Sequence, residues 1–244
     1  MDRARYIELL AEDGALLLQA ARATDLDNPV PPCPGWTVRD AVTHTADVYV
    51  DKMTIISLRG GKTETWPPER PDGWEPISYY EQSLNRLLDT FATMDDDAPA
   101  ATWWPSDNKA GLWVRRMAQE TCVHRYDVQT GAGSVTPVDA ELATDGVDEI
   151  LKLFLVGPWW DDDKWEQPDL CGKYVVSTGG RTWQAVMEPR KVTVTEDVEG
   201  EADATISGDP SNVLLWLWGR VPESDVTIEG DASKFRQRLA LVGD

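Results

Sequence analysis

Apolar and polar residues alternate with a helical period through the first half of the chain. Apolar residues that recur three and four positions apart fall on one face of a helix, so this pattern predicts helices. We expect them at residues 3–23, 38–58, 77–94 and 112–130, with Gly131 as the end of the fourth. Four helices joined by loops of mixed length are typical of a helical bundle.

A fifth helical segment, residues 136–156, leads into a second half with a different pattern. There, short runs of alternating residues are separated by Gly, Pro or charged turns, which is typical of strands. We expect strands at 173–178, 182–188, 191–196, 202–208 and 225–230, and helices at 210–220 and 231–242. This change predicts two domains, a helical bundle at residues 1–136 and a small α+β domain at residues 137–244.

Composition narrows the classes of partner. The 244-residue chain has 43 acidic and 23 basic residues and a formal net charge of −20. Nucleic-acid binding depends on clustered Lys and Arg, so no nucleic-acid partner is expected. The acidic excess favours solubility, and we expect a monomer. Since the sequence has neither a signal-peptide core nor 18 consecutive apolar residues, we expect a cytoplasmic protein without a membrane partner.

The chain contains two histidines, His44 and His124, and both lie on predicted bundle helices. Glu120 precedes His124 by four residues, so the two side chains project side by side from one helix face. They can grip one ion, with His44 on another helix as the third ligand, because inward side chains of neighbouring bundle helices converge. Two histidines and one carboxylate suit zinc, iron, nickel, cobalt or manganese.

These residues also have a purely structural interpretation. Glu and His four apart on a helix commonly form a weak surface pair, worth about 0.2–0.5 kcal/mol. A single histidine in an apolar helix is usually a hydrogen-bonded core residue. Spacing alone leaves both interpretations open.

Three segments together resemble one family. "CPGWTVRDAVTHTADVY" resembles the W-x-V-x-D-x-x-x-H segment that opens the second helix in the mycothiol-dependent maleylpyruvate isomerase family, a branch of the DinB-like metal-binding bundles. "QETCVHRYDVQTGAG" resembles that family's E-x-x-x-H-R-x-D segment. "ISGDPSNVLLWLWGR" and "VTIEGD" are similar to its small sterol-carrier-like C-terminal domain. The segments occur in the family's order and span nearly the whole chain.

The resemblance implies an α+β two-domain fold, in which a DinB-like four-helix bundle precedes the sterol-carrier-like domain. It matches His44, Glu120 and His124 to the family's three metal ligands, which are usually assigned to zinc. It also implies mycothiol or another low-molecular-weight thiol as co-substrate. A thiol bound to the metal loses its proton readily, and the thiolate then attacks a small electrophilic, acidic substrate. The enzyme is an isomerase where elimination follows and an S-transferase where it does not.

Four further residues are candidates for supporting roles. By the resemblance, Arg220 matches a catalytic arginine that the C-terminal domain presents toward the metal, where it would orient an acidic substrate or the thiol. A solvated arginine after a helix is the alternative. Arg125 and Asp127 either orient the ligands or form a surface salt bridge. Asp40 is expected as an acid of the first helical turn, with a contact to the ligands as the alternative.

Two other classes of function stay open. A metal-dependent hydrolase would use a metal-bound water and turn over without a thiol. A non-enzymatic protein that binds a small ligand would keep its binding after His44→Ala. A Ser-His-Asp hydrolase is not expected, because both histidines are assigned and no G-x-S-x-G occurs.

Overall fold

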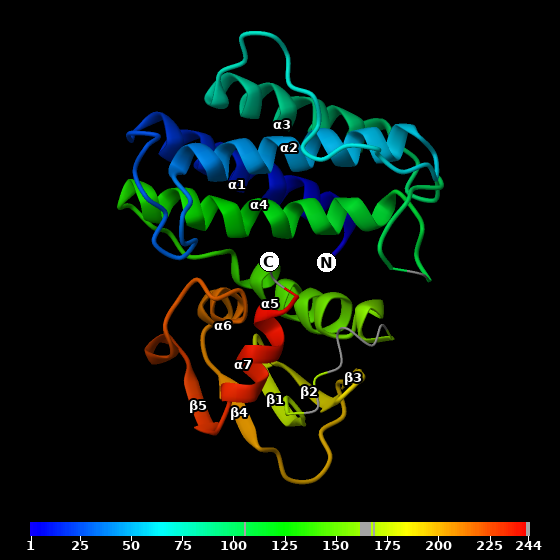
Figure 1. Cartoon of the computed structure of the whole chain (residues 1–244), viewed down its shortest axis with the longest axis vertical. Coiled ribbons are helices and arrows are strands. Elements are labelled where there is room, and N and C mark those ends of the chain that lie inside the picture. Colours follow the sequence, from blue (N-terminus) through cyan, green and yellow to red (C-terminus); the bar gives the residue numbers. More distant parts are fainter. Residues whose placement is uncertain (105, 162–166, 168, 243–244) are drawn as a thin grey trace. The chain divides into compact units, whose positions relative to one another are not determined.

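The computed structural model describes residues 1–104, 106–161, 167 and 169–242. The chain divides into two compact units, residues 1–136 and 137–244. Helices make up the described part of the first unit, and helices with a five-stranded sheet make up that of the second (Figure 1). The predicted fold class, a helical N-terminal part followed by an α+β C-terminal part, is confirmed. None of the described helices combines the length and the apolar character that crossing a bilayer requires.

Four α-helices form the described part of the first unit, and they pack against one another. Their bounds are Arg3–Arg22 (α1), Val38–Ser57 (α2), Pro76–Thr93 (α3) and Gly111–Ala132 (α4). α4 packs against both α1 and α2, and α3 covers α1 and α2 from another side. Their apolar faces meet in a core that contains Leu10, Leu17, Val42, Tyr49, Tyr80, Leu87 and Phe91.

α2 begins at a capping box. Thr37 Oγ1 accepts a hydrogen bond from the backbone N–H of Asp40, and the Asp40 carboxylate accepts one from the backbone N–H of Thr37. Asp40 is therefore an acid of the first turn with a capping role, as the sequence predicts. Because the cap fixes where the helix starts, it also fixes the turn on which His44 lies.

The end of α4 differs from the prediction, which placed it at Gly131. The helix continues to Ala132, and Gly133 follows in the left-handed conformation with φ of 71°. Gly131 has a packing role instead, because a Cβ atom there would lie 2.5 Å from Cγ2 of Val38. This glycine thus lets the start of α2 approach α4 closely.

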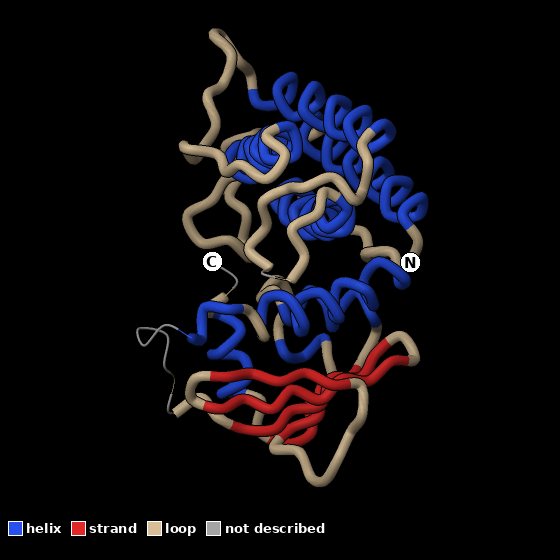
Figure 2. Tube along the Cα trace, turned by 90° about the vertical axis from the view of Figure 1, so that its right-hand side faces the viewer, coloured by secondary structure: helices blue, strands red, loops and turns tan. Residues whose placement is uncertain are grey.

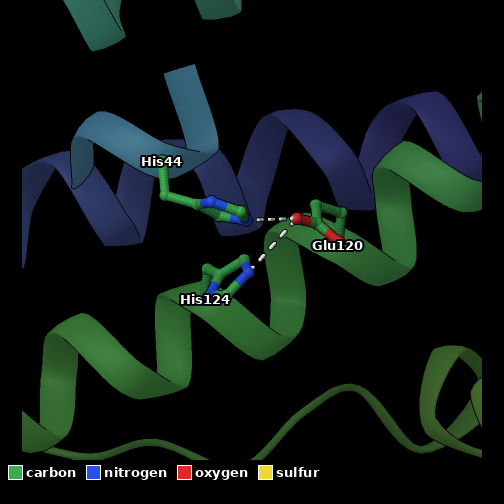
Figure 3. Close-up of side chains that lie close together, drawn as sticks. All are labelled: His44, Glu120 and His124. Atoms are coloured by element: carbon green, nitrogen blue, oxygen red, sulfur yellow. Dashed lines mark ion pairs between the residues drawn. The ribbon is translucent and has the colours of Figure 1, made fainter. Parts of the chain in front are cut away.

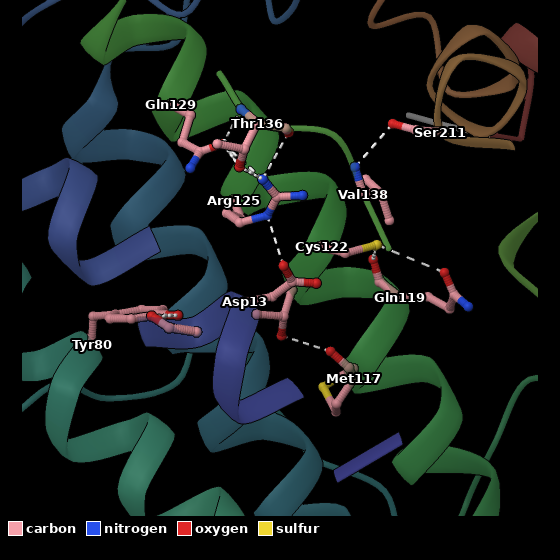
Figure 4. Close-up of polar contacts among 12 residues, drawn as sticks. Asp13, Tyr80, Met117, Gln119, Cys122, Arg125, Gln129, Thr136, Val138 and Ser211 are labelled. Carbon is pink, nitrogen blue, oxygen red and sulfur yellow. Dashed lines mark hydrogen bonds and ion pairs between the residues drawn. The ribbon is translucent and has the colours of Figure 1, made fainter. Parts of the chain in front are cut away.

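A buried ion pair joins α1 to α4 (Figure 4). Arg125 Nε lies 2.8 Å from Asp13 Oδ1, and the two side chains are 1% and 9% exposed. Arg125 Nη1 also donates hydrogen bonds to Gln129 Oε1 at 2.7 Å and to the backbone carbonyl of Thr136 at 2.9 Å. The expectation of a surface salt bridge at Arg125 is therefore wrong, since its guanidinium lies inside the unit and ties three segments together.

The second unit begins with α5 (Ala140–Glu149), whose first amides are capped by the Asp139 carboxylate. The predicted single helix changes its hydrogen-bond pattern after Glu149 and continues as a π-helical segment, Ile150–Leu155. A short 3-10 turn follows at Pro158–Asp161.

A five-stranded sheet forms the rest of the second unit together with two helices. The strands are β1 (Gly172–Thr178), β2 (Arg181–Glu188), β3 (Lys191–Thr195), β4 (Ala204–Ser207) and β5 (Thr227–Gly230). Their order is β3-β2-β1-β4-β5, with β1 and β4 parallel and the other neighbours antiparallel. The helices are α6 (Pro210–Leu217) and α7 (Ser233–Ala240). Figure 2 shows this unit's helices on one side of the sheet.

Candidate metal centre

Helices α2 and α4 bring the three predicted ligands together within the first unit. His44 lies on the second turn of α2, and Glu120 and His124 lie one turn apart on α4. Glu120 Oε1 is 3.4 Å from His44 Nε2 and 3.2 Å from His124 Nε2 (Figure 3). One ligand atom from each residue lies within 4.8 Å of the other two. The three side chains therefore converge on one point, and their binding of a metal stays a prediction.

Glu120 is the charged member of this cluster. Its side chain is 15% exposed, compared with 31% for His44 and 9% for His124. Burial by itself raises the pKa of Glu120, but His124, His44 and Arg116 outweigh it and hold the pKa well below its ordinary value. Glu120 is thus a carboxylate, which only accepts hydrogen bonds and can bind a cation.

Arg116 fixes the orientation of Glu120. It lies one turn earlier on α4, and its Nη2 donates a hydrogen bond of 2.7 Å to Glu120 Oε2. The other oxygen, Oε1, is the one that faces the imidazoles. The sequence analysis missed Arg116, although its spacing of four residues from Glu120 on a predicted helix is a usable signal.

Asp127 orients His124 from the opposite side of the ring. His124 Nδ1 lies 2.9 Å from Oδ2 of Asp127, whose side chain is fully buried. Burial lowers the pKa of His124, but the charges of Glu120 and Asp127 outweigh it and raise the pKa to about 9. Because a carboxylate only accepts, Nδ1 carries the donated proton. A cation that binds Nε2 replaces a proton there, while Nδ1 stays held by Asp127.

Trp36 lies against both imidazoles, just before the cap of α2. Its ring centroid is 5.0 Å from that of His44 and 5.9 Å from that of His124, and it stacks on the latter at 17°. An indole in this position limits the rotation of both rings and keeps water from one side of the cluster. The sequence analysis assigned no role to Trp36, although the residue opens the W-x-V-x-D segment.

The predicted catalytic residue Arg220 belongs to the second unit. It follows α6, is half-buried, and donates a hydrogen bond from Nη1 to the carbonyl of Trp218 at 2.7 Å. Its role toward a substrate or thiol stays a prediction.

The donor set fits a divalent transition metal. Zinc and related ions bind two imidazoles and one carboxylate, and ligating histidines commonly donate their second N–H to a carboxylate, as His124 does to Asp127. Three protein donors are fewer than such ions take, so a small ligand can complete the set. Within the described residues, no second group of three His, Cys, Asp or Glu side chains converges in this way.

The contact between Asp127 and His124 leads to a prediction. We expect Asp127→Asn to weaken zinc binding about 10- to 100-fold, because the amide keeps the shape but removes the charge that makes His124 a better ligand. A competition titration against a chromophoric zinc chelator measures this. Glu12→Gln, at an exposed position of α1, is the matched control. Equal zinc affinity in both variants would contradict a role for Asp127 in ligand orientation.

Comparisons with known proteins agree with this architecture. Residues 7–129 match the family model described as the mycothiol maleylpyruvate isomerase N-terminal domain, and residues 141–237 match the MDMPI C-terminal domain. The crystal structures of the mycothiol-dependent maleylpyruvate isomerase and of a histidine-to-alanine mutant of it are similar in fold. Each has a TM-score of 0.64 over 96% of both chains, at 15% and 14% identity respectively. No curated protein matches the chain significantly.

The two family models occur in the same order as the two structural units. The N-terminal model by itself spans half of the chain and includes His44, Glu120 and His124. The chain therefore belongs to the mycothiol maleylpyruvate isomerase family.

Proposed function

We propose that the protein is a metal-dependent enzyme that uses a small thiol, either an isomerase or an S-transferase, and acts on a small acidic electrophile. The observation that carries this proposal is the convergence of His44, Glu120 and His124 from two helices. It occurs in a member of a family whose name describes a mycothiol-using isomerase.

In this proposal residues 1–136 are the DinB-like metal-binding domain. His44 and His124 hold the ion, zinc by family resemblance, through Nε2, and Glu120 holds it through Oε1. An ion bound there acidifies a thiol that binds to it, which makes a thiolate available near neutral pH. Arg116 keeps Glu120 in place, Asp127 keeps the proton on Nδ1 of His124, and Trp36 limits the access of water.

The reaction follows from the chemistry of a thiolate. Addition to one carbon of a cis-enoyl diacid forms a C–S bond and turns the double bond into a single bond that rotates. Loss of the same thiolate after rotation leaves the trans isomer and regenerates the thiol. Where the C–S bond persists and the adjacent carbon takes up a proton, the product is a thioether. Arg220, from the α+β domain at residues 137–244, is proposed to pair with a carboxylate of the substrate.

Thiol dependence is the decisive test of this proposal. We expect the zinc-loaded protein to isomerise or consume maleylpyruvate in the presence of mycothiol, and to do neither without a thiol. A spectrophotometric assay of the substrate, run beside a count of free thiols, measures both quantities. A conserved thiol count indicates an isomerase, and loss of one thiol for each substrate indicates an S-transferase.

The rival functions predict different results in the same assay. Steady hydrolysis of an ester or amide by the metal-loaded protein without a thiol would overturn the proposal in favour of a hydrolase. Ligand binding that survives His44→Ala, without any turnover, would favour a binding protein.

A further inference from the structure

A pocket of about 500 Å³ lies beside His44, within the first unit. Its walls come from α2 and from the loops on either side of that helix, and they include His44 itself. Its volume is in the range of small-molecule sites, about 300–1,000 Å³. A molecule in this pocket is therefore next to a candidate metal ligand.

Aromatic side chains cover much of the pocket wall. Trp36, Trp66 and Trp74 line it. The Trp66 ring is 5.9 Å from that of His44, and Trp66 is 55% exposed. It is the one aromatic residue classed as exposed in the part of the chain that the structure describes. Leaving so large an apolar face in water is unfavourable, and it is typical of a surface that a ligand covers.

The charged residues of the pocket already have partners of opposite charge. Arg70 donates from Nε to Asp47 Oδ1 at 3.0 Å, and its guanidinium lies 4.6 Å from the Trp74 ring centroid. Arg39 pairs with Asp27 at 3.0 Å. The pocket therefore offers no surplus cation to an acidic ligand, so the proposed acidic electrophile is a poor match for it.

A neutral ligand with hydroxyl groups matches these walls better. Carboxylates and guanidinium groups that are paired still have lone pairs and N–H groups to share with hydroxyls. Thr43 also lines the pocket, is 8% exposed, and has no hydrogen-bond partner for its hydroxyl among the described residues. Threonine in a helix populates two χ1 rotamers, so this hydroxyl can turn to a ligand. The C–H face of a saturated ring would pack on the indoles.

From these features we infer that the pocket binds a neutral polyhydroxylated ring, a sugar or cyclitol, that is carried by the thiol co-substrate. Trp66 packs on the ring, and Asp47, Arg70 and Thr43 bind its hydroxyls. The position beside His44 leaves the sulfur end near the three ligands. The assignment of this ring to the thiol rests on the proposed function, whereas the binding of the ring does not.

A binding experiment on the zinc-loaded full chain tests the pocket directly. The probes are methyl α-D-glucopyranoside and myo-inositol, and the acidic comparison is maleate, followed by tryptophan fluorescence and saturation-transfer NMR. We expect at least one polyol to bind, about tenfold more weakly to Trp66→Ala and about threefold more weakly to Thr43→Val. Leu58→Ala, also exposed and just after α2, should bind as the unmodified protein does.

A second measurement assigns the ring to the thiol. We expect 1-thio-β-D-glucose to bind more tightly than 2-mercaptoethanol, and this preference to disappear in Trp66→Ala, whose zinc content should stay unchanged. The inference is overturned if neither polyol binds, if maleate displaces them, or if Trp66→Ala keeps the preference. Loss of thiol-dependent turnover with polyol binding intact would instead contradict the proposed function alone.

Discussion

Glu120→Ala and His124→Ala should each retain about a tenth or less of the zinc of the unmodified protein after gel filtration. Each variant removes one of three donors that converge within 4.8 Å, and two donors hold a divalent ion far more weakly than three. Thiol-dependent turnover should fall with the zinc content. Elemental analysis by mass spectrometry, with circular dichroism as the check of folding, measures the effect without an assay of activity.

Two further variants separate metal binding from folding. Glu120→Ala also removes the partner of Arg116, which is 5% exposed, so that variant is destabilised for a second reason. Glu120→Gln keeps a hydrogen-bond acceptor for Arg116 but removes the charge, and it should lose zinc while folding normally. Glu12→Ala, an exposed acid of α1, should keep its zinc. If all of these preparations carry the same trace of zinc, the three residues do not form a metal site.

Arg125→Met is expected to lower the free energy of unfolding by about 3–5 kcal/mol, because it leaves the Asp13 carboxylate buried without its cation. The loss is large because Arg125 also bonds to Gln129 and to the Thr136 carbonyl. Urea unfolding followed by circular dichroism measures it. The double variant Asp13→Leu/Arg125→Met should recover much of the loss, since apolar replacement of a buried ion pair is often neutral.

An exposed ion pair serves as the control for this stability prediction. Arg22 pairs with Glu81 at 2.7 Å, and their side chains are 51% and 42% exposed. Such pairs contribute about 0–1 kcal/mol, so Arg22→Met should have little effect. A loss for Arg125→Met that is no greater than that for Arg22→Met would show that the buried pair does not hold α1 to α4.

The sequence by itself determined the features that depend on neighbours along the chain. Glu120 and His124 share a helix face because residues four apart do so in any helix. Thr37 and Asp40 cap α2, and Asp139 caps α5, through contacts within three residues. The alternation of apolar and polar residues likewise located the strands, because side-chain direction along a strand is a local property.

Only the tertiary structure decided which of two local meanings a residue has. A glycine near a helix end is either a cap or a site of close packing, and Val38, distant in sequence, selects packing for Gly131. Arg125 has the same pattern whether it faces water or Asp13, and it faces Asp13. His44 lies beside Glu120, and Trp36 and Trp66 lie beside His44, because of how α2 and its loops pack. Such contacts depend on interhelical distances and loop paths, which have no periodic signature in the sequence.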